Sequence, residues 1–260
     1  MSVTPVTIGI ADCLLEPDEP GAVSLEGELA ELFPRGVRPV PACAAPHPNA
    51  TGEGGGLAGW IRPEKACSPC PADSVPQRHD PVSGASFAIP AITTEGLKFP
   101  ETRAAFRDRA QAIHRWQATV VAHPGPEGLH TFHQRSALAL MGRDPGEFAA
   151  LSRIVDQLGR GEIDFSTAAA AHLSRTLNLL ARPVTPRGLG AVLGTVWDQL
   201  AEEMTPREQR ELGQQIWAFL RGRTPARHAV HRARELLTRY PHTELAEQLE
   251  DQAQSLILAA

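Results

Sequence analysis

A repeated signal for helix starts limits how this chain can fold more than any other feature. Asp-Pro or Thr-Pro pairs recur along its second half, at Asp144-Pro145, Thr185-Pro186, Thr205-Pro206 and Thr224-Pro225. In each pair the Asp or Thr oxygen can accept hydrogen bonds from free backbone N–H groups of a first helical turn. Proline at the first helical position loses no hydrogen bond. Glutamates stand three residues after two of these caps, at Glu147 and Glu208, and predict capping boxes.

The apolar residues between these signals follow helical spacing. One stripe consists of Phe148, Leu151, Ile154, Val155 and Leu158, and another of Leu212, Ile216, Phe219 and Leu220. Stripes of this kind bury one face of a helix against its neighbours. Residues 101–260 are therefore predicted to form an all-α bundle of about six to eight helices.

Residues 1–100 show a different pattern, with short β-branched runs between loops rich in proline and glycine. Residues 6–11 and 37–40 are typical of strands, and apolar residues at helical spacing lie between them. This β-α-β order favours a parallel sheet with a right-handed crossover, and residues 87–92 are expected to add a strand. The predicted fold class is α+β with two domains: a small α/β domain with a mainly parallel sheet over residues 1–100, then a helical bundle over 101–260.

All four cysteines, Cys13, Cys43, Cys67 and Cys70, lie within the first 70 residues. Cys13 and Cys43 each follow a predicted strand, and the carboxyl ends of parallel strands face one crevice where ligands bind. Thiolates from these strand ends and from the segment Cys67-Ser68-Pro69-Cys70 can meet around one metal centre. A four-cysteine zinc site fits, although paired Cys-x-x-Cys motifs are the stronger zinc signature. An iron–sulfur cluster fits at least as well, because its thiolates come from separate segments; buried, apolar cysteines are the remaining alternative.

The order of the cysteine motifs resembles the thiouracil desulfidase (TudS-like) family. The matching stretches are Ile10-Ala11-Asp12-Cys13-Leu14-Leu15, Val40-Pro41-Ala42-Cys43 and Lys65-Ala66-Cys67-Ser68-Pro69-Cys70. A later match is Gly84-Ala85-Ser86-Phe87-Ala88. The second part of the chain is similar to the YbgA-like helical family of unknown function, through Phe132-His133-Gln134-Arg135, Arg221-Gly222 and Tyr240-Pro241.

The resemblance implies a 4Fe–4S cluster bound by Cys13, Cys43 and Cys70, with a fourth iron open to take sulfur from a thiolated pyrimidine, either free or within RNA. If Cys67 binds that iron, the cluster is closed and serves only structure or electron storage. Ala44-Ala45 stands where the family has an acidic residue after the second cysteine, which removes a candidate general acid or base. Cys67 and Ser68 are then the candidates for a catalytic role.

The alternative function is a non-catalytic interaction protein or nucleic-acid-associated helical protein, with a structural cluster or zinc in a degenerate N-terminal domain. Its partner surface is predicted in the segment 221–239, where Glu235 is the single acidic residue among many arginines. Such a segment can contact the phosphates of RNA, or it is simply a solvated face. Its arginines are Arg221, Arg223, Arg227, Arg232, Arg234 and Arg239.

A second candidate metal site lies on the expected helix around residue 130. Glu127, His130 and His133 are spaced three residues apart, but a Glu-x-x-His site needs ligands from other helices and the sequence shows none. Ordinary surface histidines are therefore the preferred interpretation.

The start of the sequence has no basic segment ahead of its apolar residues, and no stretch approaches the roughly 20 apolar residues of a membrane span. We therefore expect a cytoplasmic protein without membrane contact. Arginine greatly outnumbers lysine, as is typical of G+C-rich bacterial genomes. Acidic residues outnumber basic ones in residues 1–100, so this part has no overall electrostatic reason to bind nucleic acid.

Overall fold

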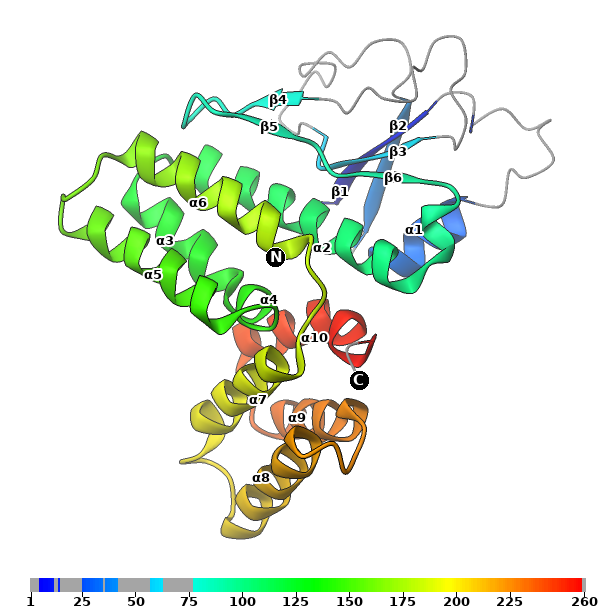
Figure 1. Ribbon diagram of the computed structural model, residues 1–260, viewed down its shortest axis with the longest axis vertical. Coiled ribbons are helices and arrows are strands. Elements are labelled where there is room, and N and C mark those ends of the chain that lie inside the picture. Colours follow the sequence, from blue (N-terminus) through cyan, green and yellow to red (C-terminus); the bar gives the residue numbers. More distant parts are fainter. Residues whose placement is uncertain are drawn as a thin grey trace. The chain divides into compact units, whose positions relative to one another are not determined.

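The computed structural model of the chain describes residues 5–11, 14, 25–34, 36–41, 57–62 and 77–258 (Figure 1). The chain divides into two compact units. The N-terminal unit consists of Met1–Leu129 and Asp164–Ser174, and the C-terminal unit of His130–Ile163 and Arg175–Ala260. The predicted domain boundary after residue 100 stays a prediction.

A parallel sheet forms the centre of the N-terminal unit. Among the described residues it has four strands in the order β2-β1-β3-β6, namely β1 (Val6–Ile10), β2 (Val37–Pro41), β3 (Gly59–Arg62) and β6 (Ala91–Thr93). Every neighbouring pair is parallel. The helix α1 (Leu25–Leu32) connects β1 to β2 along the chain. The predicted β-α-β unit and parallel sheet are thus confirmed.

The single strand predicted at residues 87–92 is two strands with different partners. β5 (Ser86–Ala88) pairs antiparallel with β4 (Gln77–His79), whereas β6 joins the parallel sheet. Pro90 lies between β5 and β6 and has no N–H with which to continue a ladder. Its carbonyl oxygen accepts the Trp60 N–H at 2.9 Å. The chain therefore changes partners at this proline.

The helix α2 (Pro100–Trp116) packs against β1, β3 and β6 of the sheet. Short helical turns flank it, η2 (Gly96–Lys98) before and η3 (Gln117–Val121) after. Near the end of α2, the Trp116 Nε1–H donates to Asp80 Oδ1 at 3.1 Å, which ties the helix to the β4–β5 connection. The second oxygen of this buried carboxylate accepts the Ser83 N–H at 2.8 Å. The aspartate therefore has partners for both oxygens, as a buried carboxylate requires.

The contact between α2 and the sheet depends on a glycine. A Cβ atom at Gly59 of β3 would lie 2.9 Å from two ring carbons of Phe106 and 3.1 Å from Ile8 Cδ1. The Phe106 ring in turn meets Phe33 edge to face, with ring centroids 6.4 Å apart. Because all these side chains are buried, a side chain on residue 59 has no free space to occupy.

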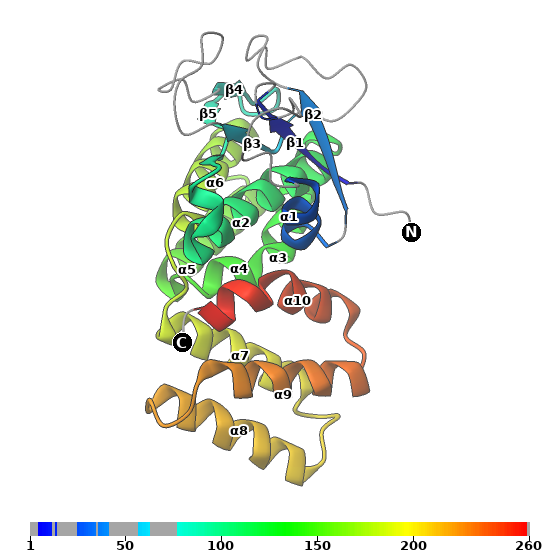
Figure 2. The ribbon, with the colours of Figure 1, turned by 90° about the vertical axis from the view of Figure 1, so that its right-hand side faces the viewer.

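Helices make up the C-terminal unit, which confirms the all-α prediction for this part of the chain (Figure 2). They are α4 (Ala137–Met141), α5 (Pro145–Gly159), α7 (Pro186–Leu200), α8 (Pro206–Leu220), α9 (Ala226–Arg239) and α10 (Thr243–Leu258). Two further helices, α3 (Pro126–Arg135) and α6 (Phe165–Leu180), are divided between the units. Within the C-terminal unit α9 packs against α7, α8 and α10.

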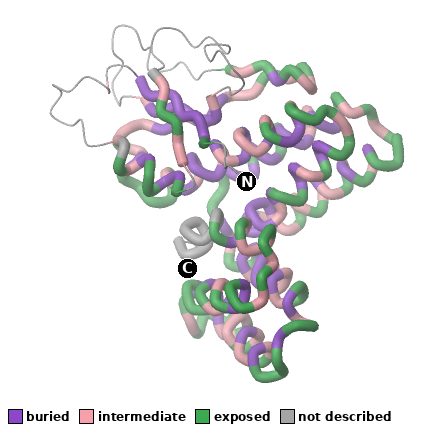
Figure 3. The backbone as a smooth tube through the Cα atoms, turned by 180° about the vertical axis from the view of Figure 1, so that it is seen from behind, coloured by how far each residue is buried: buried purple, intermediate pink, exposed green. Residues whose placement is uncertain are grey.

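The helices of the C-terminal unit bury one side and expose the other (Figure 3). Leu151, Val155 and Leu158 of α5 are buried, as their spacing predicts. A separate cluster of buried apolar residues comes mainly from α7 and α9. It includes Val192, Leu193, Val196, Ala229, Val230, Ala233 and Leu236.

Three of the four predicted helix starts have the expected cap. The side chains of Asp144, Thr185 and Thr205 accept backbone N–H groups of the first turn, and Thr205 and Glu208 form a complete capping box. The box predicted at Glu147 is only half formed, because the Asp144 N–H donates to the Leu140 carbonyl instead.

The fourth predicted start differs by one residue. α9 begins at Ala226, so Pro225 is the N-cap and Thr224 makes no cap bond.

Among the described helices, none combines the length and the apolar composition that crossing a lipid bilayer requires.

The Gly59 contact predicts a sharp difference between two alanine substitutions. Gly59→Ala is expected to destabilise the chain by about 1–3 kcal/mol, because the new methyl group forces the Phe106 ring or β3 to move. Gly194→Ala, on α7 with open space around its Cβ position, is expected to stabilise by about 0.5–1 kcal/mol through helix propensity. Urea unfolding of both variants measures the difference; equal effects would contradict the packing described for Gly59.

Candidate functional site

The predicted ligands lie in the parts of the chain outside the described residues. These are Cys13, Cys43, Cys67 and Cys70, together with Ser68. The ligand set and the choice between an open and a closed cluster therefore stay predictions. The described residues do define the strand ends from which these segments emerge.

The strand ends that lead to the cysteines lie side by side on one edge of the sheet. Ile10, the last residue of β1, pairs with Pro41 at the end of β2 on one side and with Ile61 of β3 on the other. Cys13 is the third residue after Ile10, and Cys43 is the second after Pro41. Both segments therefore start from adjacent points on the carboxyl edge, which is where ligands bind in parallel sheets.

The backbone just beyond β1 is fixed by hydrogen bonds to its neighbours. The Ala11 N–H donates to the Ile61 carbonyl at 3.0 Å, and the Leu14 N–H donates to the Ala11 carbonyl at 2.8 Å. β1 ends at Ile10 and β2 at Pro41, whereas β3 ends at Arg62, which is ionisable and partly buried. Arg62 is thus a basic residue at the position from which the segment with Cys67 and Cys70 leaves the sheet.

The Glu127, His130 and His133 spacing does not form a metal site. Glu127 and His130 are exposed, whereas His133 is 7% exposed and its ring stacks on Phe148 with centroids 5.0 Å apart. The described residues contain no group of three or more His, Cys, Asp or Glu side chains that could hold a metal ion. The preferred interpretation, ordinary surface histidines, is confirmed for His130 but is wrong for His133, which packs into the core.

His133 has a defined role as a neutral core residue. Its Nε2 lies 3.0 Å from Ser152 Oγ, and that hydroxyl donates its single hydrogen to the Phe148 carbonyl. The Ser152 oxygen must therefore accept a hydrogen bond, which assigns the hydrogen of the neutral imidazole to Nε2. Burial lowers the pKa of His133 to about 4, with a smaller contribution from His130 that Asp156 partly offsets.

The arginine-rich segment separates into two groups. Arg232, Arg234 and Arg239 form ion pairs with carboxylates of α8, α9 and α10. Arg221, Arg223 and Arg227 are exposed and have no carboxylate partner among the residues that the structure describes. The arginines without a described carboxylate partner thus lie in the first half of the segment, near the turn between α8 and α9, and contact with phosphates stays a prediction.

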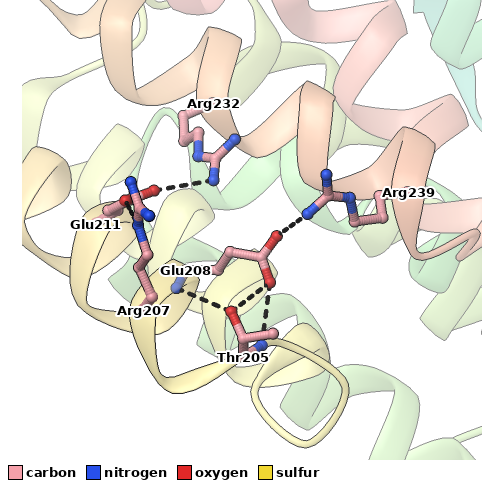
Figure 4. A pocket seen from close by; sticks show the side chains of 6 residues that line it. All are labelled: Thr205, Arg207, Glu208, Glu211, Arg232 and Arg239. Atoms are coloured by element: carbon pink, nitrogen blue, oxygen red, sulfur yellow. Dashed lines mark hydrogen bonds and ion pairs between the residues drawn. The ribbon is translucent and has the colours of Figure 1, made fainter.

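A polar pocket lies where the start of α8 meets the end of α9 (Figure 4). Glu208 is its central residue and accepts the Tyr240 hydroxyl at 2.9 Å, the Thr205 hydroxyl at 2.7 Å and a guanidinium hydrogen of Arg239. The Thr205 hydroxyl and backbone N–H are the main reason that the pKa of Glu208 falls to about 2. The full lining is Thr205, Arg207, Glu208, Glu211, Arg232 and Arg239.

The carboxylates of this pocket are held in hydrogen bonds and ion pairs. Because its pKa is low, Glu208 is ionised at neutral pH and is a weak base, and Glu211 is paired with Arg207 and Arg232. In the sequence, the spacing of Thr205 and Glu208 indicates only a local helix cap. The partners Arg239 and Tyr240 stand at the far end of the next helix, and no local pattern indicates that the two ends meet.

Comparison with known proteins identifies one part of the chain. Residues 138–249 match the model of a family described as protein of unknown function (DUF1722). This stretch begins in α4 and ends in α10. No curated protein matches the chain, and no solved structure matches it. The desulfidase-like and YbgA-like resemblances therefore stay predictions.

The buried imidazole of His133 predicts a dependence of stability on pH. Its folded-state pKa of about 4 lies below the value of about 6.5 in an unfolded chain, so the unfolded state binds the extra proton between these pH values. The contribution of His133 to the free energy of unfolding is complete above about pH 6.5. We expect it to fall by about 3 kcal/mol as the pH drops to 4.

Urea unfolding between pH 7 and pH 4 tests this dependence in the whole chain. His133→Phe, which keeps an aromatic ring against Phe148, is expected to reduce the loss of stability on acidification. His228→Gln is the matched control, because it removes an exposed histidine of α9 and should leave the dependence unchanged. An identical pH dependence in all three proteins would show that His133 is not the responsible group.

Proposed function

We propose that the N-terminal unit binds one iron–sulfur cluster through Cys13, Cys43 and Cys70, and that the protein is a desulfidase-like enzyme acting on a thiolated pyrimidine. The observation that supports this most is the parallel register of β1, β2 and β3. Because of this register, the segments that contain the cysteines leave the sheet at neighbouring points on one edge.

Chain length limits how far the first two thiols can separate. A residue spans at most about 3.6 Å along the chain, so Cys13 lies within about 11 Å of the end of β1, and Cys43 within about 7 Å of the end of β2. These two ends belong to adjacent strands, which lie about 4.8 Å apart. A cluster that bridges both cysteines therefore needs no rearrangement of the sheet.

The donor set suits an iron–sulfur cluster in its chemistry. Thiolates from separate segments are the usual ligands of such clusters. When bound, a cluster with one iron free of cysteine supplies a Lewis acid suited to a soft sulfur atom. The protein's own part is to hold the three thiolates and to leave that iron accessible.

A non-catalytic role is the second candidate. Cys43 is followed by Ala44-Ala45, so the chain offers no carboxylate at the position where the resembled family has one. Without it the protein loses a ready group for moving a proton during hydrolysis. In this reading the cluster, or a zinc ion bound by all four cysteines, stabilises the unit.

Elemental analysis of protein purified without oxygen tests the metal centre. We expect about four irons and about four acid-labile sulfides per chain, and Cys43→Ser is expected to lose most of both. Cys67→Ser is the matched control and should retain the iron if Cys67 is not a ligand. Loss of iron from Cys67→Ser as well would indicate a closed cluster, and absence of both iron and zinc from the native chain would refute the proposal.

Consumption of thiouracil under the same conditions separates the two functions. A desulfidase removes sulfur from the base and yields sulfide and uracil, and it loses this activity in Cys43→Ser. A structural cluster or zinc site gives metal in the protein but no loss of thiouracil. Far-UV circular dichroism of each variant checks that the helical part remains folded.

A further inference from the structure

The outward face of α8 combines an exposed indole with cationic side chains. Arg210, Gln214, Trp217 and Arg221 follow one another at spacings of four, three and four residues, so they lie on one side of the helix. All are exposed, and Trp217 keeps 49% of its surface accessible. Leu220 beside them is 53% exposed. The indole of Trp217 is therefore accessible to a ligand.

The turn after α8 fixes two arginines around the tryptophan. Gly222 adopts a φ of 66°, and its N–H and that of Arg223 donate to the Phe219 and Ala218 carbonyls at 2.8 and 2.9 Å. This left-handed helix end folds the chain back toward α8. As a result the guanidinium carbons of Arg221 and Arg223 lie 4.6 and 5.0 Å from the Trp217 ring centroid.

The charge of this face is not balanced within the described residues. Arg210, Arg221, Arg223 and Arg227 have no carboxylate partner there. The nearest acidic side chains of α8 and α9, Glu208, Glu211 and Glu235, are already paired with other arginines. This surface is therefore complementary to an anionic partner.

The indole narrows the class of anion. Arginines and a planar aromatic ring together match a single-stranded nucleic acid, whose phosphates pair with guanidinium groups and whose bases stack on indole rings and on the planes of guanidinium groups. An acidic peptide would use the charges but has no need of the ring, and the bases of a duplex are already stacked. We propose that Trp217, with Arg210, Arg221 and Arg223, binds single-stranded nucleic acid. This proposal does not depend on the metal centre of the N-terminal unit.

Binding of a labelled single-stranded RNA of about 12 nucleotides to the full chain, followed by fluorescence anisotropy at low salt, tests the proposal. Trp217→Ala is expected to weaken binding about tenfold or more, because it removes base stacking. Trp217→Phe, which keeps an aromatic face, should recover part of the affinity. The Trp217 side chain is half exposed, and thermal unfolding of both variants verifies that the fold is kept.

The arginines are tested through the salt dependence of binding. Affinity falls as salt rises, and the double variant Arg221→Gln/Arg223→Gln should make this fall less steep. The slope of log affinity against log salt should become less negative by roughly 1.4, the value for two phosphate contacts. Arg160→Gln with Arg234→Gln removes the same charge from arginines that have carboxylate partners, and should leave the slope nearly unchanged.

Three results would overturn the proposal. The first is no RNA binding by the native chain, and the second is unchanged affinity in Trp217→Ala. The third is equally tight binding of a glutamate-rich peptide that the same variants abolish, which would assign the surface to an acidic protein.

Discussion

The parallel pairing of β1 with strands on both sides is the constraint on which the N-terminal unit depends. All five residues of β1 are buried, and its end pairs with β2 and β3 at the same level. Because β1 is paired on both sides, its register fixes the level at which both neighbouring strands end. The edge from which the cysteine segments emerge is therefore set by the packing of the core. The same packing leaves no room for a side chain at Gly59, where α2 crosses the sheet.

The C-terminal unit is held together by polar contacts at the ends of its helices as well as by its apolar core. Glu208 caps its own helix and at the same time binds Arg239 and Tyr240 at the end of α9. This fixes one end of the α8–α9 pair. The other end is the turn at Gly222, where Arg221 and Arg223 have no carboxylate partner among the described residues. One end of the helix pair is therefore closed by ion pairs, whereas the arginines at the other end are exposed.

Local signals in the sequence predicted much of this fold. The caps at Asp144, Thr185 and Thr205 involve groups within three residues of each other, so a short stretch of sequence is enough to predict them. The β-α-β order was equally local. The exposure of Leu220 was not predicted, because it was assigned to the buried stripe of Leu212; at about 100° per residue it lies about 80° around the helix from that position.

Contacts between distant segments escaped sequence analysis. Nothing near Glu208 indicates its bond to Tyr240, and spacing alone placed His133 with Glu127 and His130 although it packs on Phe148. The position of Arg221 and Arg223 over the Trp217 ring depends on the turn after α8, and no local pattern in the sequence indicates it. The cysteine positions, in contrast, are a sequence prediction for which the structure supplies only the strand ends.

The proximity of the first two thiols is the central claim, and a thiol cross-linker measures it most directly. In the variant Cys67→Ser/Cys70→Ser, freed of metal, only Cys13 and Cys43 can react with dibromobimane, which fluoresces strongly after joining two neighbouring thiols. We predict one fluorescent cross-link between the two cysteines in the folded chain, lost when the chain is unfolded in urea. Two separate single additions in the folded chain, without the cross-link, would contradict the account.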